Sequence, residues 1–457
     1  MSKKLFGTDG VRGVANSKLT PEIALAIGQA AGIYLSRSGE PQLAVLGRDT
    51  RASCDMLAAA VSAGLCSAGV SVYDLGVAPT PAVSFISRTG EFGLGVIVSA
   101  SHNPAPDNGI KFVGHGGAKL PDETELAIEE LIDSKFDRPI GGSVGRIQHG
   151  RDGIERYLAM LESIVPERLD GWRVAIDAAH GAAWELGPTI LRRLGAKVCA
   201  TGTHPDGVNI NAVGGATKPD TICKVTVDSG SQVGVAFDGD ADRAVFSDGQ
   251  GRLINGDRTM GIWAEHTKGA GRLDPSLIVG TVMSNGGFVE YLAQQNITVE
   301  RAPVGDKYVA ERIRSTGALI GGEQSGHIIF PHHGPTGDGL VTMLELFRVL
   351  KLTGKTAAEF YESYEPWPQL LVNVAVDATA GWQETLRDVL EEGRERLGSR
   401  GRLVVRPSGT QPVIRVMVEA DEYAARDQVA DRIVSAMEQR MGGHVEGRVD
   451  LTYALGD

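Results

Sequence analysis

Three aspartates at alternate positions follow a short apolar stretch of the chain. The stretch, "VGVAF" at residues 233–237, has the length and composition of a buried strand. The aspartates come directly after it: Asp238, Asp240 and Asp242. Alternate residues of an extended segment face the same way, so the three carboxylates are expected to converge. A hard divalent cation with oxygen ligands would neutralise them, and the pattern therefore predicts a metal site.

Two alternatives for these aspartates differ in how well they fit the sequence. A calcium-binding EF-hand loop needs Gly at its sixth position and Glu at its twelfth. Counted from Asp238, those positions hold Arg243 and Gly249, so the sequence excludes an EF-hand. A polar turn after a strand stays open as an alternative, because Asp and Gly are common in turns.

A serine lies just past the end of a second predicted buried strand. Ser101 follows "LGVIVSA" at residues 94–100, and in open α/β sheets ligand sites lie beyond the carboxyl ends of the strands. A Mg²⁺ ion commonly takes phosphate oxygens as additional ligands, which makes Ser101 a candidate for phosphate chemistry beside the aspartates. A serine hydroxyl needs a base to become a nucleophile, and the adjacent His102 is expected to point elsewhere. The alternative is a serine in a loop or at a helix cap.

Two further loops carry groups that suit a phosphorylated sugar. In "GGEQSGH", residues 321–327, Glu323 and Ser325 can form hydrogen bonds with vicinal hydroxyls, and His327 can move a proton near neutral pH. The second loop, "RPSGTQPVIR", offers a guanidinium group, two hydroxyls and several backbone amides, all of which can donate hydrogen bonds to a phosphate. It therefore predicts a phosphate-binding loop at Arg406, Ser408, Gly409 and Thr410. For each loop the alternative is an ordinary glycine-containing turn.

Several other polar residues have less specific settings. Arg12, in the glycine-rich "GTDGVRG", is a candidate phosphate contact. Arg48 and Arg51, near the end of a predicted strand, are interpreted as structural ion-pairing residues. The pair His332 and His333 lies in a loop rich in Gly and Pro, and we expect it to be solvated and not to bind a metal.

Helix and strand patterns alternate along most of the chain, which predicts sheets with parallel strands and helices on both faces. The alternation occurs three times, over residues 1–150, 151–254 and 255–366. After "YEPWPQ" the composition changes, and residues 367–457 are expected to form a smaller α+β domain with a helix at about residues 382–397. The fold class predicted is α/β, with three similar domains of parallel or mixed sheets followed by a C-terminal α+β domain.

The composition excludes several classes of function. A chain of 457 residues with a formal net charge of -12 lacks the basic surface that nucleic acids or anionic membranes require. No apolar run approaches the roughly 20 residues that a membrane span needs. The N-terminus has no secretory signal, and the four cysteines are scattered, so we expect a cytoplasmic protein.

Taken together, these loops resemble those of the alpha-D-phosphohexomutases over nearly the whole chain. "SASHNP" resembles the phosphoserine loop of that family, "DGDADR" the metal loop, "GGEQSGH" the sugar loop and "RPSGTQP" the phosphate loop. The order of the four motifs makes the resemblance specific, whereas one motif alone would be weak. The opening "FGTDGVRG" and "PDGVNIN" are most similar to the bacterial branch that acts on glucosamine phosphates, although Gln411 stands where that branch usually has Glu.

The resemblance implies a four-domain isomerase with a central cleft that interconverts glucosamine 6-phosphate and glucosamine 1-phosphate. The reaction would pass through a phosphoserine and a 1,6-bisphosphate, in amino-sugar and cell-wall precursor metabolism. One Mg²⁺ per active site is implied, with glucose or glucosamine 1,6-bisphosphate as activator and intermediate. The expected metal ligands are the phosphate on Ser101 and the three aspartates.

The resemblance also assigns roles to individual residues. The expected catalytic residues are Ser101, Lys111, Arg243, His327 and Arg12. The expected substrate-binding residues are Glu323, Ser325, Arg406, Ser408, Gly409, Thr410 and Arg415. The sequence leaves open whether Lys111 or His327 is the general base. It also leaves open a phosphomannomutase or phosphoglucomutase, a non-catalytic protein that binds phosphosugar and metal, and assembly as a homodimer.

Overall fold

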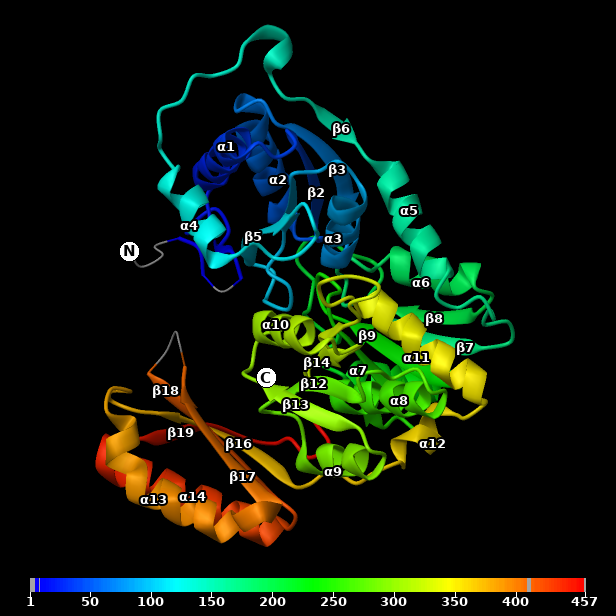
Figure 1. Cartoon of the computed structure of the whole chain (residues 1–457), viewed down its shortest axis with the longest axis vertical. Helices are drawn as coiled ribbons and strands as arrows, with labels where there is room; N and C mark the ends of the chain where they lie inside the picture. The colour runs from blue at the N-terminus through cyan, green and yellow to red at the C-terminus, as the bar shows by residue number, and fades with distance from the viewer. Residues whose placement is uncertain (1–4, 8, 409–411, 456–457) are drawn as a thin grey trace.

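The computed structural model describes residues 5–7, 9–408 and 412–455 of the chain. Four sheets follow one another along the sequence, each with its own helices, and the N-terminal and C-terminal sheets lie toward opposite ends of the molecule (Figure 1). The three α/β sheets are mixed and the C-terminal sheet is antiparallel. The predicted fold class is therefore confirmed, and the exact domain boundaries remain a prediction.

The first sheet has six strands in the order β1-β5-β4-β2-β3-β6. Its strands are β1 (Val11–Val14), β2 (Leu43–Arg48), β3 (Ser71–Val77), β4 (Leu94–Val98), β5 (Asp107–Gly114) and β6 (Ile147–His149). Its helices are α1 (Pro21–Ser38), α2 (Ala52–Ser67), α3 (Thr80–Thr89) and α4 (Asp122–Glu130), with a 3₁₀ turn at Gly141–Ser143. The first helix begins as its sequence predicts, with Pro21 in its first turn and the Thr20 side chain accepting a hydrogen bond from the Ile23 amide.

The second sheet has five strands in the order β11-β10-β9-β7-β8. Its strands are β7 (Arg173–Asp177), β8 (Lys197–Thr201), β9 (Val233–Phe237), β10 (Ala244–Asp248) and β11 (Leu253–Ile254). The accompanying helices are α5 (Arg151–Glu162), α6 (Leu186–Arg193) and α7 (Asp220–Asp228). The buried strand β9 pairs antiparallel with β10, so the aspartate loop at residues 238–243 is the turn of a hairpin.

The third sheet has four strands in the order β13-β12-β14-β15. Its strands are β12 (Leu277–Thr281), β13 (Thr298–Ala302), β14 (Gly321–Gly322) and β15 (Ile328–Ile329). Its helices are α8 (Gly256–Gly269), α9 (Gly286–Gln294), α10 (Asp306–Thr316), α11 (Gly339–Thr353) and α12 (Ala357–Tyr361). The predicted sugar loop is the short turn that joins the antiparallel strands β14 and β15.

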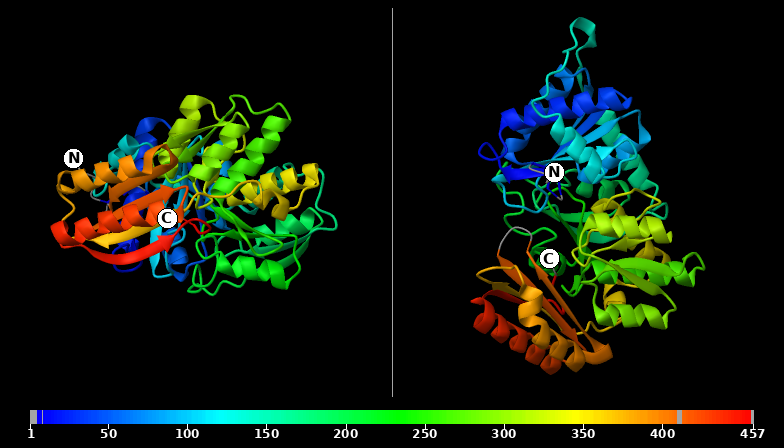
Figure 2. Two further views of the ribbon diagram at one scale, coloured as in Figure 1. Left: turned by 90° about the horizontal axis from the view of Figure 1, so that it is seen from below. Right: turned by 60° about the vertical axis from the view of Figure 1, so that its left-hand side comes forward.

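The C-terminal sheet is antiparallel in the order β17-β18-β16-β19 and is covered by two helices. Its elements are β16 (Gln369–Ala375), α13 (Trp382–Leu397), a 3₁₀ turn (Gly398–Arg400), β17 (Gly401–Pro407), β18 (Val413–Ala420), α14 (Tyr423–Met441) and β19 (His444–Asp450). The domain has a hydrophobic core of its own and forms a distinct unit beside the third domain (Figures 1 and 2).

A few hydrogen bonds join the C-terminal domain to the third domain. The Gly286 amide, at the start of α9, donates to the Glu419 carboxylate at 3.0 Å. Arg402, near the start of β17, donates to the carbonyls of Val282 and Ser284 at 2.9 and 2.7 Å. The attachment therefore involves the beginning of β17 and the end of β18.

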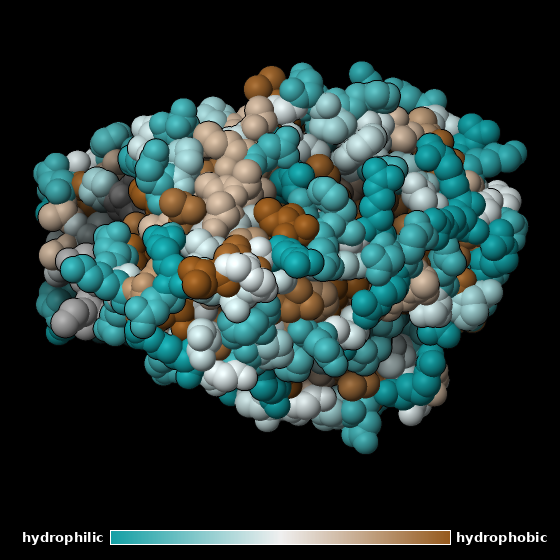
Figure 3. Space-filling view, turned by 90° about the horizontal axis from the view of Figure 1, so that it is seen from above, coloured by the Kyte–Doolittle hydropathy of each residue, from teal (hydrophilic) through white to brown (hydrophobic). Residues whose placement is uncertain are grey.

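Within the residues described, no helix combines the length and the apolar character that crossing a bilayer demands. One face of the molecule shows hydrophobic side chains in small groups on a mainly hydrophilic surface (Figure 3).

Candidate active site

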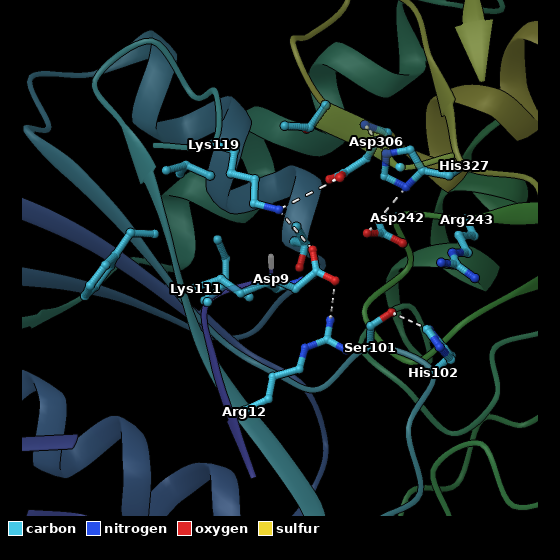
Figure 4. A pocket seen from close by; sticks show the side chains of 18 of the residues that line it. Asp9, Arg12, Ser101, His102, Lys111, Lys119, Asp242, Arg243, Asp306 and His327 are labelled. Atoms are coloured by element: carbon cyan, nitrogen blue, oxygen red, sulfur yellow. Dashed lines mark hydrogen bonds and ion pairs between the residues drawn. The ribbon is translucent and has the colours of Figure 1, made fainter. Parts of the chain in front are cut away.

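The structure places Ser101 against the aspartate loop of the second domain. Ser101 lies between β4 and β5, and its hydroxyl donates to Asp238 Oδ2 at 2.7 Å. The hydroxyl also lies 3.3 Å from His102 Nδ1 (Figure 4), so the expectation that His102 points elsewhere is wrong. Its backbone is left-handed, with φ at 51°. A non-glycine residue in such a conformation costs about 1–3 kcal/mol and persists only where its surroundings hold it. The serine loop is therefore a constrained feature of the fold.

Two side chains, those of Arg51 and Asn211, bind the backbone of the serine loop and fix its position. The buried Arg51 guanidinium donates to the carbonyls of Ser101 and Asn103 at 2.9 and 2.8 Å, and it pairs with the buried Asp49 carboxylate at 2.9 Å. Asn211, from the second domain, donates to the same Ser101 carbonyl at 2.8 Å. The interpretation of Arg51 as an ion-pairing residue is correct, but it missed that Arg51 also positions the serine.

Gly239 allows the serine and aspartate loops to approach each other. A Cβ atom at this position would lie 2.4 Å from the Ser101 carbonyl oxygen, which is well inside van der Waals contact. A side chain here would push the two loops apart. The Asp-Gly-Asp sequence therefore serves close packing between domains as well as the convergence of carboxylates.

Replacing Arg51 by methionine is expected to lower the free energy of unfolding by about 3–5 kcal/mol, because it leaves the Asp49 carboxylate buried and unpaired. Urea unfolding of the purified protein measures this change. The matched control is Arg48→Met, because Arg48 pairs with a partly exposed Asp74, and we expect a loss of about 1 kcal/mol there. Equal losses in the two variants would contradict the role given to Arg51.

Each carboxylate of the trio has a different neighbour. Asp240 accepts hydrogen bonds from Lys111 Nζ at 2.8 Å and from Thr80 Oγ1 at 2.6 Å. Asp242 Oδ2 lies 3.5 Å from His327 Nδ1. The trio offers three carboxylate oxygens that all lie within 4.8 Å of one another: one each from Asp238, Asp240 and Asp242. The convergence predicted from the sequence is thus present.

The electrostatics of the trio suit a divalent cation. Burial raises the pKa of Asp238 well above its ordinary value, and the other two carboxylates raise it further. Burial alone would also raise the pKa of Asp240, but Lys111 outweighs it and lowers that pKa. The second oxygens of Asp240 and Asp242 are buried, with no hydrogen-bond partner among the described residues. Buried, unpaired carboxylate oxygens are costly, and a cation bound between them would remove that cost.

Lys111 and His327 are the cations next to the trio. Burial lowers the pKa of His327, but the Asp242 carboxylate outweighs burial and raises this pKa to about 9. Burial likewise lowers the pKa of Lys111, and Asp240 outweighs it and raises the pKa above its ordinary value. Lys111 therefore carries a proton at neutral pH in this geometry, which suits donating a proton better than accepting one. For His327 the raised pKa and the hydrogen bonding point in opposite directions, because its Nε2 accepts a hydrogen bond from the Gly337 amide at 3.2 Å, which requires the neutral ring.

A cavity of about 220 Å³ opens above the trio, between the first three domains (Figure 4). The predicted residues that line it are Arg12, Ser101, Lys111, Asp242, Arg243, Glu323 and His327. Asp238 and Asp240 lie below this surface, and each is 1% exposed. Ser325, at 9% exposed, belongs to the neighbouring sugar loop and is not a lining residue.

The predicted phosphate loop is carried by the C-terminal domain. Arg406 and Arg415 are directly opposite each other on β17 and β18, and Ser408 follows β17. Burial lowers the pKa of Arg406 and Arg415 lowers it further, whereas the Glu323 carboxylate opposes them. That interaction indicates that the end of β17 faces the sugar loop. Gly409, Thr410 and Gln411 lie outside the described residues.

Sequence reasoning missed a group of charged residues at the mouth of the cavity. Lys119 Nζ lies 3.0 Å from Asp9 Oδ1 and 3.8 Å from Asp306 Oδ1, so it links the first and third domains across the cavity (Figure 4). Arg12 also pairs with Asp9, at 3.5 Å. Asp9 belongs to the same "GTDGVRG" stretch as Arg12, and this proximity was an available signal. Asp306 lies in "VGDKYV", a segment that also resembles the family, whereas Lys119 stands in no pattern that marks it.

Comparison with known proteins identifies the family. Four family models, all described as phosphoglucomutase/phosphomannomutase, match the chain in order: alpha/beta/alpha domain I at residues 3–138, domain II at 155–251, domain III at 255–367 and the C-terminal domain at 371–436. The chain belongs to the phosphoglucomutase/phosphomannomutase family. The resemblance to the alpha-D-phosphohexomutases is therefore confirmed.

Individual known proteins resemble the chain over most of its length. The phosphoglucosamine mutase of Salinispora arenicola is 47% identical over 438 residues, 94% of this chain and 97% of that protein. A phosphoglucomutase/phosphomannomutase family protein from Burkholderia thailandensis has a crystal structure that matches with a TM-score of 0.81 at 24% identity, over 98% of this chain and 100% of the other. The N-acetylphosphoglucosamine mutase of Aspergillus fumigatus, solved with GlcNAc-6P and magnesium, matches with a TM-score of 0.64 at 18% identity, over 96% of each chain.

Proposed function

We propose that this protein is a phosphoglucosamine mutase that interconverts glucosamine 6-phosphate and glucosamine 1-phosphate. The observation that carries the proposal is the contact between the Ser101 hydroxyl and the carboxylate trio, 2.7 Å from Asp238, at the floor of a cavity. The choice of an amino sugar is supported by the 47% identity to a phosphoglucosamine mutase from Salinispora arenicola.

In the proposed reaction, Ser101 carries a phosphoryl group in the active enzyme. The bond between that phosphorus and Ser101 Oγ breaks as a bond to a hydroxyl of the sugar forms, which gives glucosamine 1,6-bisphosphate. The bisphosphate then reorients in the cavity, so that its two phosphates exchange places. Ser101 accepts the phosphoryl group that the substrate originally carried. Phosphoryl transfer of this kind depends mainly on positioning and on charge stabilisation.

The carboxylate trio is the proposed site of one Mg²⁺ ion, together with an oxygen of the phosphoserine. When bound there, Mg²⁺ would neutralise negative charge on the transferred group. Arg243 and Arg12 line the same cavity and are proposed to contact that group from the protein side. Lys111 and His327 are proposed to exchange a proton with the sugar hydroxyl.

The rest of the substrate is proposed to lie between the sugar loop and the C-terminal domain. Glu323 and Ser325 would bind the sugar hydroxyls in both orientations of the bisphosphate. The phosphate that is not reacting would be bound by Arg406, Ser408, Gly409, Thr410 and Arg415. A 1,6-bisphosphate supplied in solution is proposed as the activator that phosphorylates Ser101. We propose a cytoplasmic location.

A kinetic comparison tests the substrate assignment. Purified protein should convert glucosamine 6-phosphate with a kcat/KM about tenfold or more above that for glucose 6-phosphate or mannose 6-phosphate, which corresponds to about 1.4 kcal/mol of transition-state discrimination. A coupled assay with each phosphosugar, Mg²⁺ and its 1,6-bisphosphate measures the three values. A preference for glucose or mannose would assign the chain to another branch, and no conversion of any of them would indicate a non-catalytic binding protein.

A further inference from the structure

A second cluster of possible metal ligands lies outside the active site. It consists of His332 and His333, in the loop between β15 and α11, and Glu345 on α11. His333 Nε2 lies 2.6 Å from Glu345 Oε1, and His332 Nε2 lies 3.6 Å from the same oxygen. The three ligand atoms all lie within 4.8 Å of one another. Both imidazoles thus point one nitrogen at one carboxylate oxygen.

The surroundings fix the carboxylate and leave the cluster open on one side. Trp263, on α8, donates to the other Glu345 oxygen at 2.9 Å, so that Oε1 is directed at the histidines. The Glu345 side chain is 8% exposed, that of His333 is 20% exposed and that of His332 is 45% exposed. The expectation that this histidine pair is solvated is therefore wrong for His333.

A cavity of about 250 Å³ adjoins the cluster and gives it access from solvent. Its walls include His332, Glu345 and Trp263, and also His266 from the last turn of α8. The Nε2 atom of His266 is buried and has no hydrogen-bond partner among the described residues. An imidazole nitrogen of this kind is an available acceptor for a water molecule in the cavity.

We propose that His332, His333 and Glu345 form a binding site for a divalent transition-metal ion of the zinc class. Two imidazole nitrogens and one carboxylate oxygen are a donor set that Zn²⁺ and Co²⁺ prefer, whereas Mg²⁺ prefers oxygen ligands alone. Zinc lies about 2.0–2.1 Å from such nitrogens, so tetrahedral ligands are separated by about 3.3 Å. The two nitrogen–oxygen separations in the cluster, 2.6 and 3.6 Å, lie on either side of that value.

The Glu345 carboxylate is already oriented before a metal arrives. Trp263 binds one of its oxygens at 2.9 Å, and the other oxygen faces the two imidazoles. The fourth ligand of a bound ion would be a water molecule in the cavity beside His266.

The site would fix the loop that also borders the active site. Further along this loop, the Gly337 amide lies 3.2 Å from His327 Nε2, and Thr336 lines the catalytic cavity. Arg88, on α3 of the first domain, donates to the His333 carbonyl. A metal that joins His332 and His333 to α11 would thus hold a segment that contacts both His327 and the first domain. Its role is structural, because it does not touch the substrate cavity.

Titration with Co²⁺ tests the proposal, since the visible absorption of cobalt(II) changes when nitrogen ligands bind it. The metal-free full-length protein is titrated in saturating Mg²⁺, which occupies the aspartate site. We expect one Co²⁺ per chain, and competition by Zn²⁺. His332→Ala should weaken Co²⁺ binding by about 10- to 100-fold or more, the range found when a supporting residue of a metal site is removed. His332 is half-exposed, so this variant is expected to fold.

Two matched variants distinguish Co²⁺ binding at this cluster from Co²⁺ binding elsewhere on the protein. His204→Ala removes an exposed histidine elsewhere and should leave Co²⁺ affinity unchanged. Asp240→Asn alters the aspartate site and should also leave it unchanged. Zn²⁺ should raise the Tm of the wild-type protein and not that of His332→Ala. Absence of Co²⁺ binding in saturating Mg²⁺, or equal affinity in the wild type and His332→Ala, would show that the cluster is only a histidine–carboxylate ion pair.

Discussion

Replacing Ser101 by alanine is expected to lower kcat/KM for glucosamine 6-phosphate by about 10⁴- to 10⁶-fold, the scale seen when the nucleophile of a covalent mechanism is removed. The substitution removes the oxygen that carries the phosphoryl group, so no bisphosphate can form. Folding should be preserved, because the substitution removes one oxygen atom, and the backbone of this loop is held by Arg51 and Asn211. A coupled assay and intact-mass analysis measure the two consequences, loss of turnover and loss of the phosphorylated species.

The matched control for this variant is Ser87→Ala. Ser87 is also fully buried in the first domain, and its hydroxyl donates to the Gly114 carbonyl away from the cavity. This variant should lose about 1 kcal/mol of stability and retain activity. If the Ser101 variant kept more than a trace of turnover, or if peptide mapping found the phosphate on another residue, Ser101 would not be the nucleophile.

The second large effect is expected for Asp240→Asn. The Mg²⁺ concentration for half-maximal activity should rise at least about 10- to 100-fold, because a carboxylate of the metal site is lost. At saturating Mg²⁺, kcat should fall by about 10²- to 10³-fold, as when one electrostatic contact to the transition state is removed. Lys111 would also lose its ion pair, which is 2.8 Å long and mostly buried. Initial rates over a range of Mg²⁺ concentrations measure both changes.

Asp248→Asn is the control for the loss of a buried aspartate in the same hairpin. Asp248, at the end of β10, is fully buried and pairs with Arg252 at 2.7 Å, away from the cavity. This variant is expected to be less stable and to keep the wild-type dependence on Mg²⁺. A similar shift of Mg²⁺ dependence in both variants would mean that the aspartate trio does not bind the catalytic ion.

The aspartate site was predictable because its signal is local. An apolar stretch ended at Phe237, and three closely spaced aspartates followed it. The reason given for their convergence was wrong, because residues 238–243 form a hairpin turn, with Ala241 at a φ of 58°, and not the extended segment in which alternate residues face the same way. The start of α1 was predictable for the same reason, since the Thr20 cap, Pro21 and a helical pattern lie within a few neighbouring residues. The helix expected at about residues 382–397 is α13. The segmentation into α/β units came from the order of helices and strands, and the four sheets follow that order.

The rest of the site depends on contacts between distant segments, which one sequence does not reveal. Thr80 donates a hydrogen bond to Asp240, which lies 160 residues further along the chain. Nothing in the sequence around Thr80, which follows a proline, indicates that contact. The antiparallel strands β5 and β10 were not predicted, because each follows a loop whose Asp and Gly residues indicate a turn more strongly than a strand. For Arg51, the ion pair was predicted, but its hydrogen bond to the Ser101 carbonyl was not.

The C-terminal domain is attached to the third domain near the start of β17, so a rotation of the domain would move the far end of this strand most. Arg402, near its fixed end, binds carbonyls of the third domain, and Ser408 follows its other end, about 20 Å away at about 3.3 Å per residue. Swinging the domain through an arc of about 10° would displace Ser408 by about 3.5 Å over that length. A displacement of this size is enough to make or break every hydrogen bond to a phosphate group. A small change in the orientation of the C-terminal domain at Val282 and Ser284 would therefore produce a larger displacement of the phosphate loop, where the substrate enters and leaves.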